Sequence, residues 1–440
     1  MALTIGMISL GCTKNRVDSE QALGVLKQNG YLLVSDPAQA DILVVNTCGF
    51  IESAKEESID TILEMAQYKQ TGRCRLLVVT GCLAQRYQET LFNEMTEIDV
   101  LMGVNNYDQL LKAIDKALKG QRTACCAPKL DFWEHDRVLT TPSYTAYTRI
   151  GDGCNNCCTY CAIPLIRGKY RSRPMERILS EVAQLAGQGV KEHILVAQDT
   201  TRYGTDWQEH TLLPELMEKA AALPGVDWLR VLYCYPDETD LRLLEAMSRH
   251  NNICKYLDLP IQHISGRLLK EMNRRGTPGE IKATLKAARQ MGFALRTSII
   301  VGFPGETEDD FKELMDFIEE QQFDRLGAFT YSAEEDTKAA LMPNQIPQEL
   351  KDERLDILMK RQTAISLSRN QKRVGDVCRV LITGKEGHQY IGRSQWEAPE
   401  IDGQIYFTAD KDLSVGQFTR VRLTGADTYD LEGVADESAK

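Results

Sequence analysis

The sequence predicts an α/β protein in three parts: an N-terminal domain with a parallel sheet, a central partial (β/α)6 barrel, and a small antiparallel β-barrel at the C-terminus. Apolar runs alternate with amphipathic stretches over most of the chain, which is typical of parallel sheets. The chain has 440 residues, enough for two or three cores. The last part changes to short β-prone pieces separated by glycines, which is typical of small barrels.

The N-terminal domain is expected over residues 1–138, with strands at 3–9, 41–46, 76–80 and 98–102 and helices such as 53–68 and 107–119. Cys12, Cys48 and Cys82 each come just after one of the first three strands. Carboxyl ends of parallel strands share one edge, where open α/β folds place their ligands. We therefore expect these three cysteines to be neighbours in space. Residues 125–143 contain two prolines and predict a linker.

The central domain is expected over residues 139–371. Strand candidates lie at 144–150, 193–197, 228–234, 256–259, 295–301 and 326–331, and helical stretches at 175–187, 212–222, 279–290 and 308–321. Six β/α units indicate an incomplete barrel, whose loops after the strands should carry the site. A charged helix is expected at about 347–369. The last domain, 372–440, has β-prone pieces at 377–383, 404–407 and 418–424.

Charge and cysteine content narrow the class of protein. No apolar run approaches the ~18 residues of a membrane helix, and the first residues lack a signal-peptide pattern, so we expect a cytoplasmic protein without membrane contact. Thirteen cysteines in such a chain suggest metal ligands rather than disulfides. The net charge of −11 favours a basic partner over a nucleic acid.

A C-x3-C-x2-C motif is the strongest feature of the sequence. Cys154, Cys158 and Cys161 place three thiols within eight residues. Soft thiolates select iron–sulfur clusters or zinc, and structural zinc sites usually close with four ligands. Three ligands would leave one iron of a 4Fe–4S cube open. Cys157 creates an overlapping spacing and is expected to be a bystander, while zinc and purely structural thiols remain alternatives.

With this motif on the first barrel loop, the chain resembles the methylthiotransferase family of the radical S-adenosylmethionine (SAM) superfamily. The resemblance covers essentially the whole chain, and its C-terminal part resembles a TRAM domain. The matching stretches include Leu10-Gly-Cys-Thr-Lys-Asn-Arg-Val-Asp-Ser-Glu20, Asn46-Thr-Cys-Gly-Phe-Ile-Glu-Ser-Ala54, Thr80-Gly-Cys-Leu-Ala-Gln85 and Val301-Gly-Phe-Pro-Gly-Glu-Thr307. Ala398-Pro-Glu-Ile-Asp-Gly403 is similar to the branch of the family that modifies a ribosomal protein.

The resemblance implies a radical SAM methylthiotransferase with two 4Fe–4S clusters. Cys154, Cys158 and Cys161 would hold the cluster that binds and cleaves SAM, and Cys12, Cys48 and Cys82 an auxiliary cluster that carries sulfur. One SAM would methylate that sulfur, and a radical from a second SAM would remove hydrogen from the substrate carbon. The implied substrate is the β-carbon of an aspartate in ribosomal protein S-twelve of the small subunit. A reducing protein such as flavodoxin is the implied electron donor.

Two other functions stay open from the sequence. The first is methylthiolation of an adenosine in tRNA, for which nearly the same motifs would serve. Residues 373–440 carry eight Lys and Arg against twelve Asp and Glu, which disfavours phosphate binding. Glu397, Glu400 and Asp402 lie around the Ala398 motif and predict an acidic surface for a basic protein. The second is a non-catalytic metal-binding adaptor on ribosomes.

Several residues are expected to bind SAM or orient the substrate. Tyr160, directly before the last cysteine, is expected to lie against the adenine. The others are polar or glycine residues of the barrel: Gln198, Asp199, Gln262, Arg296, Ser298 and Gly302. The stretch 302–305 is alternatively a tight turn, and His263 a structural histidine. Arg167, Arg171 and Arg173 predict either a salt-bridged loop or contact with a carboxylate.

Overall fold

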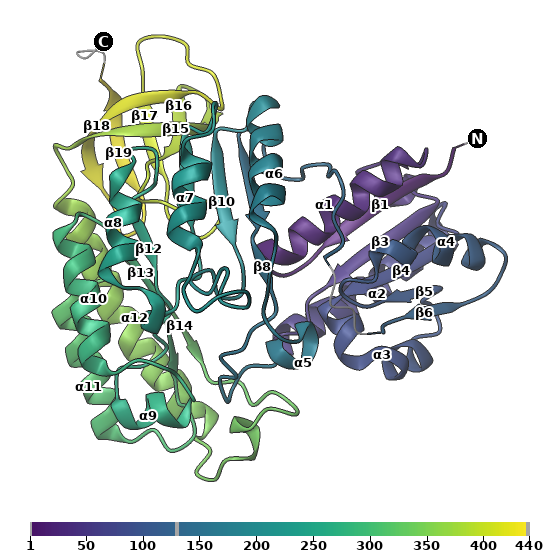
Figure 1. The fold of residues 1–440 in the computed structure, drawn as a ribbon, viewed down its shortest axis with the longest axis horizontal. Helices are drawn as coiled ribbons and strands as arrows, with labels where there is room; N and C mark the ends of the chain where they lie inside the picture. Colours follow the sequence, from purple (N-terminus) through teal and green to yellow (C-terminus); the bar gives the residue numbers. More distant parts are fainter. Residues whose placement is uncertain (1, 128–131, 437–440) are drawn as a thin grey trace.

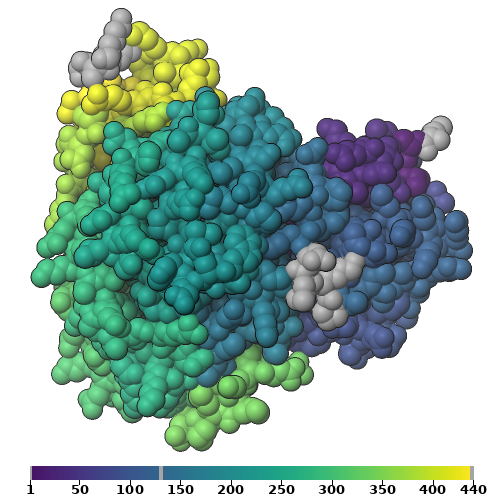
Figure 2. All heavy atoms as spheres, viewed as in Figure 1, coloured from purple at the N-terminus to yellow at the C-terminus, as the bar shows by residue number. Residues whose placement is uncertain are grey.

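The computed structural model describes residues 2–127 and 132–436 and has the three predicted parts (Figure 1). The middle of the expected linker, residues 128–131, lies outside the described residues, as do residue 1 and residues 437–440. Figure 2 shows the N-terminal domain, purple to blue, projecting from one side of the body that the other two parts form. In the part of the chain that the structure describes, every helix is too short or too polar to cross a membrane.

The N-terminal domain is a six-stranded parallel sheet in the order β2-β1-β3-β4-β5-β6. All four predicted strands are present, and two short edge strands were not predicted. The strands are β1 (Thr4–Ser9), β2 (Leu32–Leu33), β3 (Ile42–Thr47), β4 (Leu76–Gly81), β5 (Val100–Met102) and β6 (Thr123–Cys125). The strand order reverses between β1 and β3, so this sheet has a topological switch point at its carboxyl edge.

Helices cover both faces of this sheet. They are α1 (Thr13–Gln28), α2 (Glu52–Thr71), α3 (Cys82–Glu94) and α4 (Leu110–Leu118). Along β3, Ile42 and Val44 pack toward α1 and α4, while Leu43 and Val45 pack toward α2 and α3. This alternation explains why the central strands are continuous apolar runs in the sequence.

The central domain is an open barrel of six parallel strands, as predicted. Two three-stranded sheets, β7-β10-β11 and β12-β13-β14, are joined by a bridge between Leu229 and Ile253. The strands are β7 (Thr145–Arg149), β10 (Glu192–Val196), β11 (Trp228–Val231), β12 (Tyr256–Asp258), β13 (Ala294–Val301) and β14 (Arg325–Thr330). A small antiparallel pair, β8 (Gly151–Asp152) and β9 (Arg171–Ser172), closes the base of the loop that carries the C-x3-C-x2-C motif.

The outer layer of the barrel consists of α6 (Met175–Gly187), α7 (Leu213–Ala221), α8 (Leu241–Arg249), α9 (Gly266–Glu271), α10 (Pro278–Gln290), α11 (Glu308–Gln321) and α12 (Gln348–Gln371). The short helix α5 (Ile163–Arg167) follows the loop with the C-x3-C-x2-C motif and packs against the N-terminal domain. Short 3-10 turns occur at Pro37–Gln39, Tyr107–Gln109, Pro236–Glu238 and Ala339–Leu341. On β13, Leu295, Ile299 and Val301 pack against the helices. Because strand residues alternate between faces, Arg296, Ser298 and Ile300 face the barrel interior.

The C-terminal domain is a closed barrel in the order β15-β16-β17-β19-β18. Its strands are β15 (Val377–Glu386), β16 (Gln389–Arg393), β17 (Ile405–Thr408), β18 (Phe418–Ala426) and β19 (Leu431–Ala435). The predicted antiparallel pairing holds for four of the five neighbouring pairs, and β17 with β19 is parallel. Five strands cannot alternate in direction around a closed ring, so at least one parallel pair is unavoidable.

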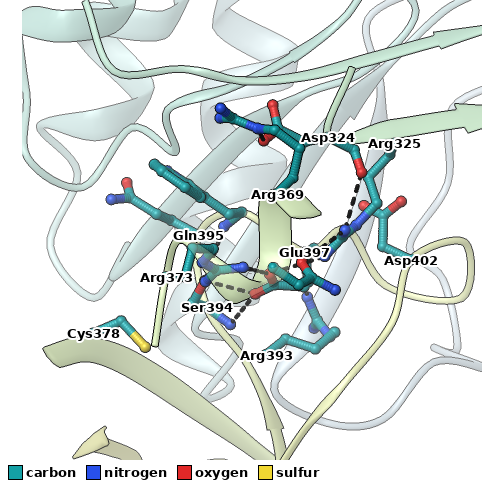
Figure 3. Close-up of polar contacts among 12 residues, drawn as sticks. Asp324, Arg325, Arg369, Arg373, Cys378, Arg393, Ser394, Gln395, Glu397 and Asp402 are labelled. Carbon is teal, nitrogen blue, oxygen red and sulfur yellow. Dashed lines mark hydrogen bonds and ion pairs between the residues drawn. The ribbon is translucent and has the colours of Figure 1, made fainter. Parts of the chain in front are cut away.

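Buried ion pairs fix this domain to the barrel. Glu192 of β10 accepts from Arg230 at 3.1 Å and from Arg393 of β16 at 2.6 Å. Glu397 is fully buried between Arg373, Ser394 and Arg325 (Figure 3). Burial alone would raise the pKa of Glu192, but Arg393 and Arg230 lower it to about 2. Both acids therefore belong to the domain interface.

Candidate functional site

Cys12, Cys48 and Cys82 lie together at the carboxyl edge of the N-terminal sheet. Cys12 directly precedes α1, Cys48 follows β3, and Cys82 is the first residue of α3. Gly11 has φ +83°, and a Cβ placed on it would lie 3.1 Å from the sulfur of Cys48. The loop before Cys12 therefore touches Cys48 at the switch point between β1 and β3. This arrangement agrees with the predicted neighbourhood of the three thiols.

The three thiols also influence one another electrostatically. Burial raises the pKa of Cys82 to about 12, and Arg167 opposes the rise while Cys12 and Cys48 add to it. Burial likewise raises the pKa of Cys48, with a further contribution from Cys12. Cys12 is exposed, Cys48 is half-buried and Cys82 is buried. A group that binds the trio would thus have one side open to the barrel and to solvent.

The second trio lies on the loop between β8 and α5. The backbone N–H of Asn156 donates to the sulfur of Cys154 at 3.5 Å, and the Cys158 sulfur is 3.5 Å from the hydroxyl of Tyr235. The guanidinium of Arg274 lies 3.9 Å from the Cys158 sulfur. Burial raises the pKa of Cys154 to about 12, and Asp199 and Cys158 raise it further. Cys157 is exposed and has φ +50°, and its carbonyl oxygen accepts a hydrogen bond from the side chain of Asn273.

Both trios have the donor set of an iron–sulfur cluster. Each offers three thiols that follow parallel strands, and only Cys12 among the six is fully exposed. In residues 2–127 and 132–436, no three His, Cys, Asp or Glu side chains are gathered tightly enough for a single metal ion. A four-iron cube holds its cysteine sulfurs further apart than a single ion does, because each sulfur binds a different corner. Three soft donors per site therefore fit a cube with one open iron.

Helix α5 connects the two trios. Ala162 and Ile166, which follow Cys161, pack against Cys82 and Val104 of the N-terminal domain. At the end of the helix, Arg167 lies 3.6 Å from the sulfur of Cys82. The two candidate cluster sites are thus neighbours across the domain boundary, at the carboxyl ends of both sheets.

The three arginines that follow the cysteine loop, Arg167, Arg171 and Arg173, form internal ion pairs. This is the salt-bridged loop that the sequence analysis gave as one of two alternatives. Arg167 pairs with Asp18 at 2.9 Å and with Asp152 at 3.1 Å. The remaining contacts are those of Arg171 with Asp152 and of Arg173 with Glu134 and Glu181. Burial would raise the pKa of Asp152, but Arg167, Arg149 and Arg171 hold it well below its usual range. Through Asp18, Arg167 anchors the cysteine loop to the N-terminal domain.

The residues expected to bind SAM divide into three groups. Tyr160 and Ile300 both pack against the apolar cluster that contains Phe303, and the hydroxyl of Tyr160 accepts from Arg274 at 3.0 Å. Gln262 has φ +70° and pairs its backbone with Ser298 and Ile300. Tyr160, Gln262 and Ser298 therefore come together at the carboxyl end of β13, in reach of a ligand above the barrel.

Gln198 and Asp199 support the cysteine loop. The amide of Gln198 donates to Asp152 at 3.1 Å. Asp199 is fully buried and accepts from Asn156 at 2.7 Å and from Thr201. Burial raises the pKa of Asp199, which these hydrogen bonds only partly oppose. Asn156 lies between Cys154 and Cys158 in the sequence, so its contact with Asp199 holds the cysteine loop in place.

Arg296 and Gly302 have neighbours in the structure that the sequence did not indicate. Arg296 lies near the amino end of β13, pairs with Asp258 at 2.6 Å, and lines a cavity of about 370 Å³ with Asp402 and Tyr429 of the C-terminal domain. A Cβ on Gly302, which has φ +71°, would lie 2.3 Å from the side chain of Lys351. The glycine thus makes room for α12, which is the tight-turn alternative.

The predicted acidic surface around Ala398 is wrong for two of its three members. Glu397 is buried among arginines, and Asp402 accepts from the hydroxyl of Tyr256 at 2.6 Å. Only Glu400 is exposed, and it pairs with Arg16 of α1. Charges that are neighbours in sequence here serve separate internal contacts, which a count of acids cannot distinguish.

Sequence reasoning singled out neither Arg274 nor Lys14, both of which lie at the site. Arg274 stacks 4.3 Å from the ring centroid of Tyr235, beside Cys158. It is 113 positions beyond Cys161, in no recognisable motif. Lys14 lies two residues after Cys12, and its ammonium lies 3.5 Å from the ring centroid of Tyr233 of the barrel. Its place in the matched stretch around Cys12 was the one available indication.

Three family models match the chain. They are the Uncharacterized protein family UPF0004 at residues 4–103, the Radical SAM superfamily at 148–318 and the TRAM domain at 374–435. Among solved structures, TsrM of Kitasatospora setae, a radical SAM methyltransferase with cobalamin and a 4Fe–4S cluster bound, superposes with a TM-score of 0.56 at 13% identity, over 75% of each chain. OxsB, with aqua-cobalamin and SAM bound, superposes with a TM-score of 0.52 at 13% identity, over 83% of this chain and 58% of its own. At this identity the likeness shows the fold alone.

Curated relatives are much closer in sequence. The "Ribosomal protein uS12 methylthiotransferase RimO" of Desulforamulus reducens is 50% identical over 438 residues, which are 98% of this chain and 99% of that protein. The protein of the same name from Clostridium botulinum is 49% identical over 436 residues and 98% of both chains. The resemblance predicted from the sequence is thereby confirmed. The chain belongs to the RimO family of ribosomal protein uS12 methylthiotransferases, and its central domain to the radical SAM superfamily.

Proposed function

We propose that this protein is a radical SAM methylthiotransferase that adds a methylthio group to the β-carbon of an aspartate in ribosomal protein uS12, the S-twelve protein of the small subunit. The observation that carries the proposal is the pair of cysteine trios, one in each of two domains, joined by α5 and Arg167. Relatives at half identity over the full length carry this activity in their names. A sulfur donor site and a radical site need to be neighbours for this reaction, and the two trios are.

The ligand assignment is the one that the family resemblance implies, and the two sets of three thiols are compatible with it. Cys154, Cys158 and Cys161 would hold the cluster that binds SAM, and Cys12, Cys48 and Cys82 a second 4Fe–4S cluster. When bound, the first cluster supplies the electron that splits SAM into methionine and a 5′-deoxyadenosyl radical, and the second carries the sulfur. A radical is required because an unactivated C–H bond is too weakly acidic for a side-chain base.

The protein's own residues bind, orient and shield. Asp199 and Asn156 fix the loop of the SAM-binding trio, and Arg274 places positive charge beside Cys158. Tyr160 and Ser298 line the carboxyl end of the barrel, where the nucleoside of SAM would lie. We propose SAM contact for Tyr160, Gln262 and Ser298, a supporting role for Gln198 and Asp199, and structural roles for Arg296 and Gly302.

Methylthiolation of an adenosine in tRNA has less support. A tRNA site must neutralise phosphates with Lys and Arg. The chain has net charge −11, and its C-terminal domain has more acids than bases. Arg167, Arg171 and Arg173, which follow the cysteine loop, are already paired with internal carboxylates. A basic ribosomal protein therefore suits this molecule better than a nucleic acid.

The proposed reaction also needs an electron donor and a cellular compartment. The electron would come from a reducing protein such as flavodoxin, because SAM cleavage needs an external reductant. Because the substrate belongs to the ribosome, the reaction would take place in the cytoplasm.

The experiment that tests the function is an anaerobic assay with recombinant uS12. The protein is reconstituted with iron and sulfide and supplied with SAM and a reductant, and uS12 is then examined by mass spectrometry. We expect one aspartate to gain a methylthio group in place of hydrogen. Cys158→Ala should abolish both this product and 5′-deoxyadenosine, whereas Cys157→Ala should retain them. Modification of tRNA instead of uS12 would contradict the proposal, and absence of SAM cleavage would favour a non-catalytic adaptor.

A further inference from the structure

The side chain of Lys14 extends from the N-terminal domain to the mouth of the barrel. Lys14 lies in the first turn of α1, two residues after Cys12, and is only 7% exposed. Its ammonium lies 3.5 Å from the ring centroid of Tyr233, which follows β11 at the carboxyl end of the barrel. The cation is therefore located where the two candidate cluster sites face the barrel interior.

This ammonium lacks a carboxylate partner in the part of the chain that the structure describes: no ion pair within 4.0 Å involves it. Asp18, one turn further along α1, would be the usual partner at spacing i,i+4. However, both oxygens of Asp18 are taken, one by Arg149 and the other by Arg167.

The acid that contacts Tyr233 is also occupied. Asp258 accepts from the backbone N–H of Tyr233 at 2.8 Å and pairs with Arg296 at 2.6 Å. This contact holds Tyr233 at φ +63°, a conformation that a non-glycine residue keeps only when its surroundings enforce it. The ring that supports the ammonium is thus fixed before any ligand arrives.

A buried cation without an anion is costly, and contact with an aromatic ring offsets the cost only in part. Within the chain, the ammonium interacts electrostatically with the thiol of Cys12, but the proposed function assigns that thiol to the auxiliary cluster. The carboxylate that completes the site should therefore come from outside the polypeptide. We propose that Lys14 binds the side-chain carboxylate of the target aspartate and thereby selects aspartate as the residue to be modified.

This inference rests on the proposed function and adds a substrate-binding residue to it. The carboxyl carbon of aspartate is bonded directly to the β-carbon, so holding the carboxylate anchors a group one bond away from the reacting carbon. Charge-assisted hydrogen bonds to a carboxylate are short and directional. Lys14 would thus orient the substrate from the side of the sulfur-carrying domain, opposite the SAM-binding loop.

The test is a double-mutant cycle on binding, so that it does not depend on turnover. Reconstituted wild-type enzyme and Lys14→Met are titrated without reductant against labelled uS12 and against uS12 with the target aspartate replaced by asparagine. We expect Lys14→Met to weaken binding of normal uS12 by about 10- to 100-fold, the range for a hydrogen bond to a charged group. The asparagine protein should bind both enzymes equally, because the carboxylate that Lys14 recognises is absent.

Three further measurements separate the alternatives. Lys27→Met, on an exposed turn of the same helix, should bind normal uS12 like the wild type. Lys14→Arg should retain part of the preference for aspartate, because it keeps the charge. The iron content of Lys14→Met should equal that of the wild type.

Equal weakening toward aspartate and asparagine proteins would overturn the proposal. Loss of about half the iron together with such equal weakening would show that Lys14 serves the auxiliary cluster instead. Failure of the proposed function is distinguishable, because wild-type uS12 would then remain unmodified by the wild-type enzyme.

Discussion

Replacing Arg167 by methionine tests how the cysteine loop is held to the N-terminal domain. The buried guanidinium donates to Asn15 at 2.7 Å, to Asp18 at 2.9 Å and to Asp152 at 3.1 Å, and lies 3.6 Å from the sulfur of Cys82. Methionine has a similar apolar stem but neither donates nor carries charge. The substitution therefore removes the central cation and little packing.

The expected cost follows from what remains around the two acids. Removing one partner of a buried ion pair costs about 3–5 kcal/mol. Asp18 keeps its contact with Arg149, and Asp152 keeps Arg171 at 3.2 Å, so neither acid is left alone. We therefore expect a loss of stability at the low end of this range, about 3 kcal/mol, which corresponds to about 100-fold more frequent local opening.

Native-state hydrogen exchange measures this opening directly. In Arg167→Met, backbone amides of α1 should exchange about 100-fold faster than in the wild type. Arg177→Met is the control, because Arg177 is exposed on α6 and surface substitutions change stability by at most about 0.5 kcal/mol. If Arg167→Met exchanged no faster than Arg177→Met, the view of Arg167 as the link between the two domains would be refuted.

Two further substitutions test the barrel and its contact with the C-terminal domain. Gly302→Ala should lower the free energy of unfolding by about 3 kcal/mol, and the control Gly292→Ala by about 1 kcal/mol. Both glycines have positive φ, but only a Cβ at residue 302 would meet a neighbour, Lys351, at 2.3 Å. Equal losses of unfolding free energy in chemical denaturation would contradict this. Glu192→Gln should loosen the C-terminal barrel by about 3 kcal/mol at neutral pH, as seen by hydrogen exchange in β15 and β16, because Arg393 and Arg230 lose their anion. The pKa of Glu192 is lowered to about 2, so its contribution to stability is complete above about pH 4.3 and is lost as the pH falls toward 2. In Glu192→Gln, the loss of stability between these pH values should be smaller than in the wild type. An unchanged loss would contradict the role of Glu192 in this ion pair.

Much of the fold could be predicted because it depends on local patterns. The strands β3 and β4 are apolar runs buried on both faces, and the alternation of strand and helix indicates a parallel sheet. The edge strands β2 and β6 have only two and three residues, too few to form a pattern. Cys12, Cys48 and Cys82 could be grouped because the ends of parallel strands share an edge.

The rest depends on contacts between distant parts of the chain. Lys14 meets Tyr233, and Arg167 meets Asp18, across domain boundaries that no periodicity reveals. The sequence predicts either a ligand contact or a tight turn at Gly302. It does not reveal that Lys351 fills the space beside this glycine, because Lys351 comes 49 residues later. Arg296 and Ser298 share a face of β13, but depth along the strand decides which is near the cysteine loop.

The most direct test of the central claim is the iron and sulfide content after anaerobic reconstitution. Wild type is compared with a variant in which Cys154, Cys158 and Cys161 are all alanine, with Cys157→Ala as the matched control. We predict about eight irons for the wild type and the control, and about four for the triple variant, because each trio holds its own cube. About four irons falling to none would contradict the account, since Cys12, Cys48 and Cys82 would then hold no cluster.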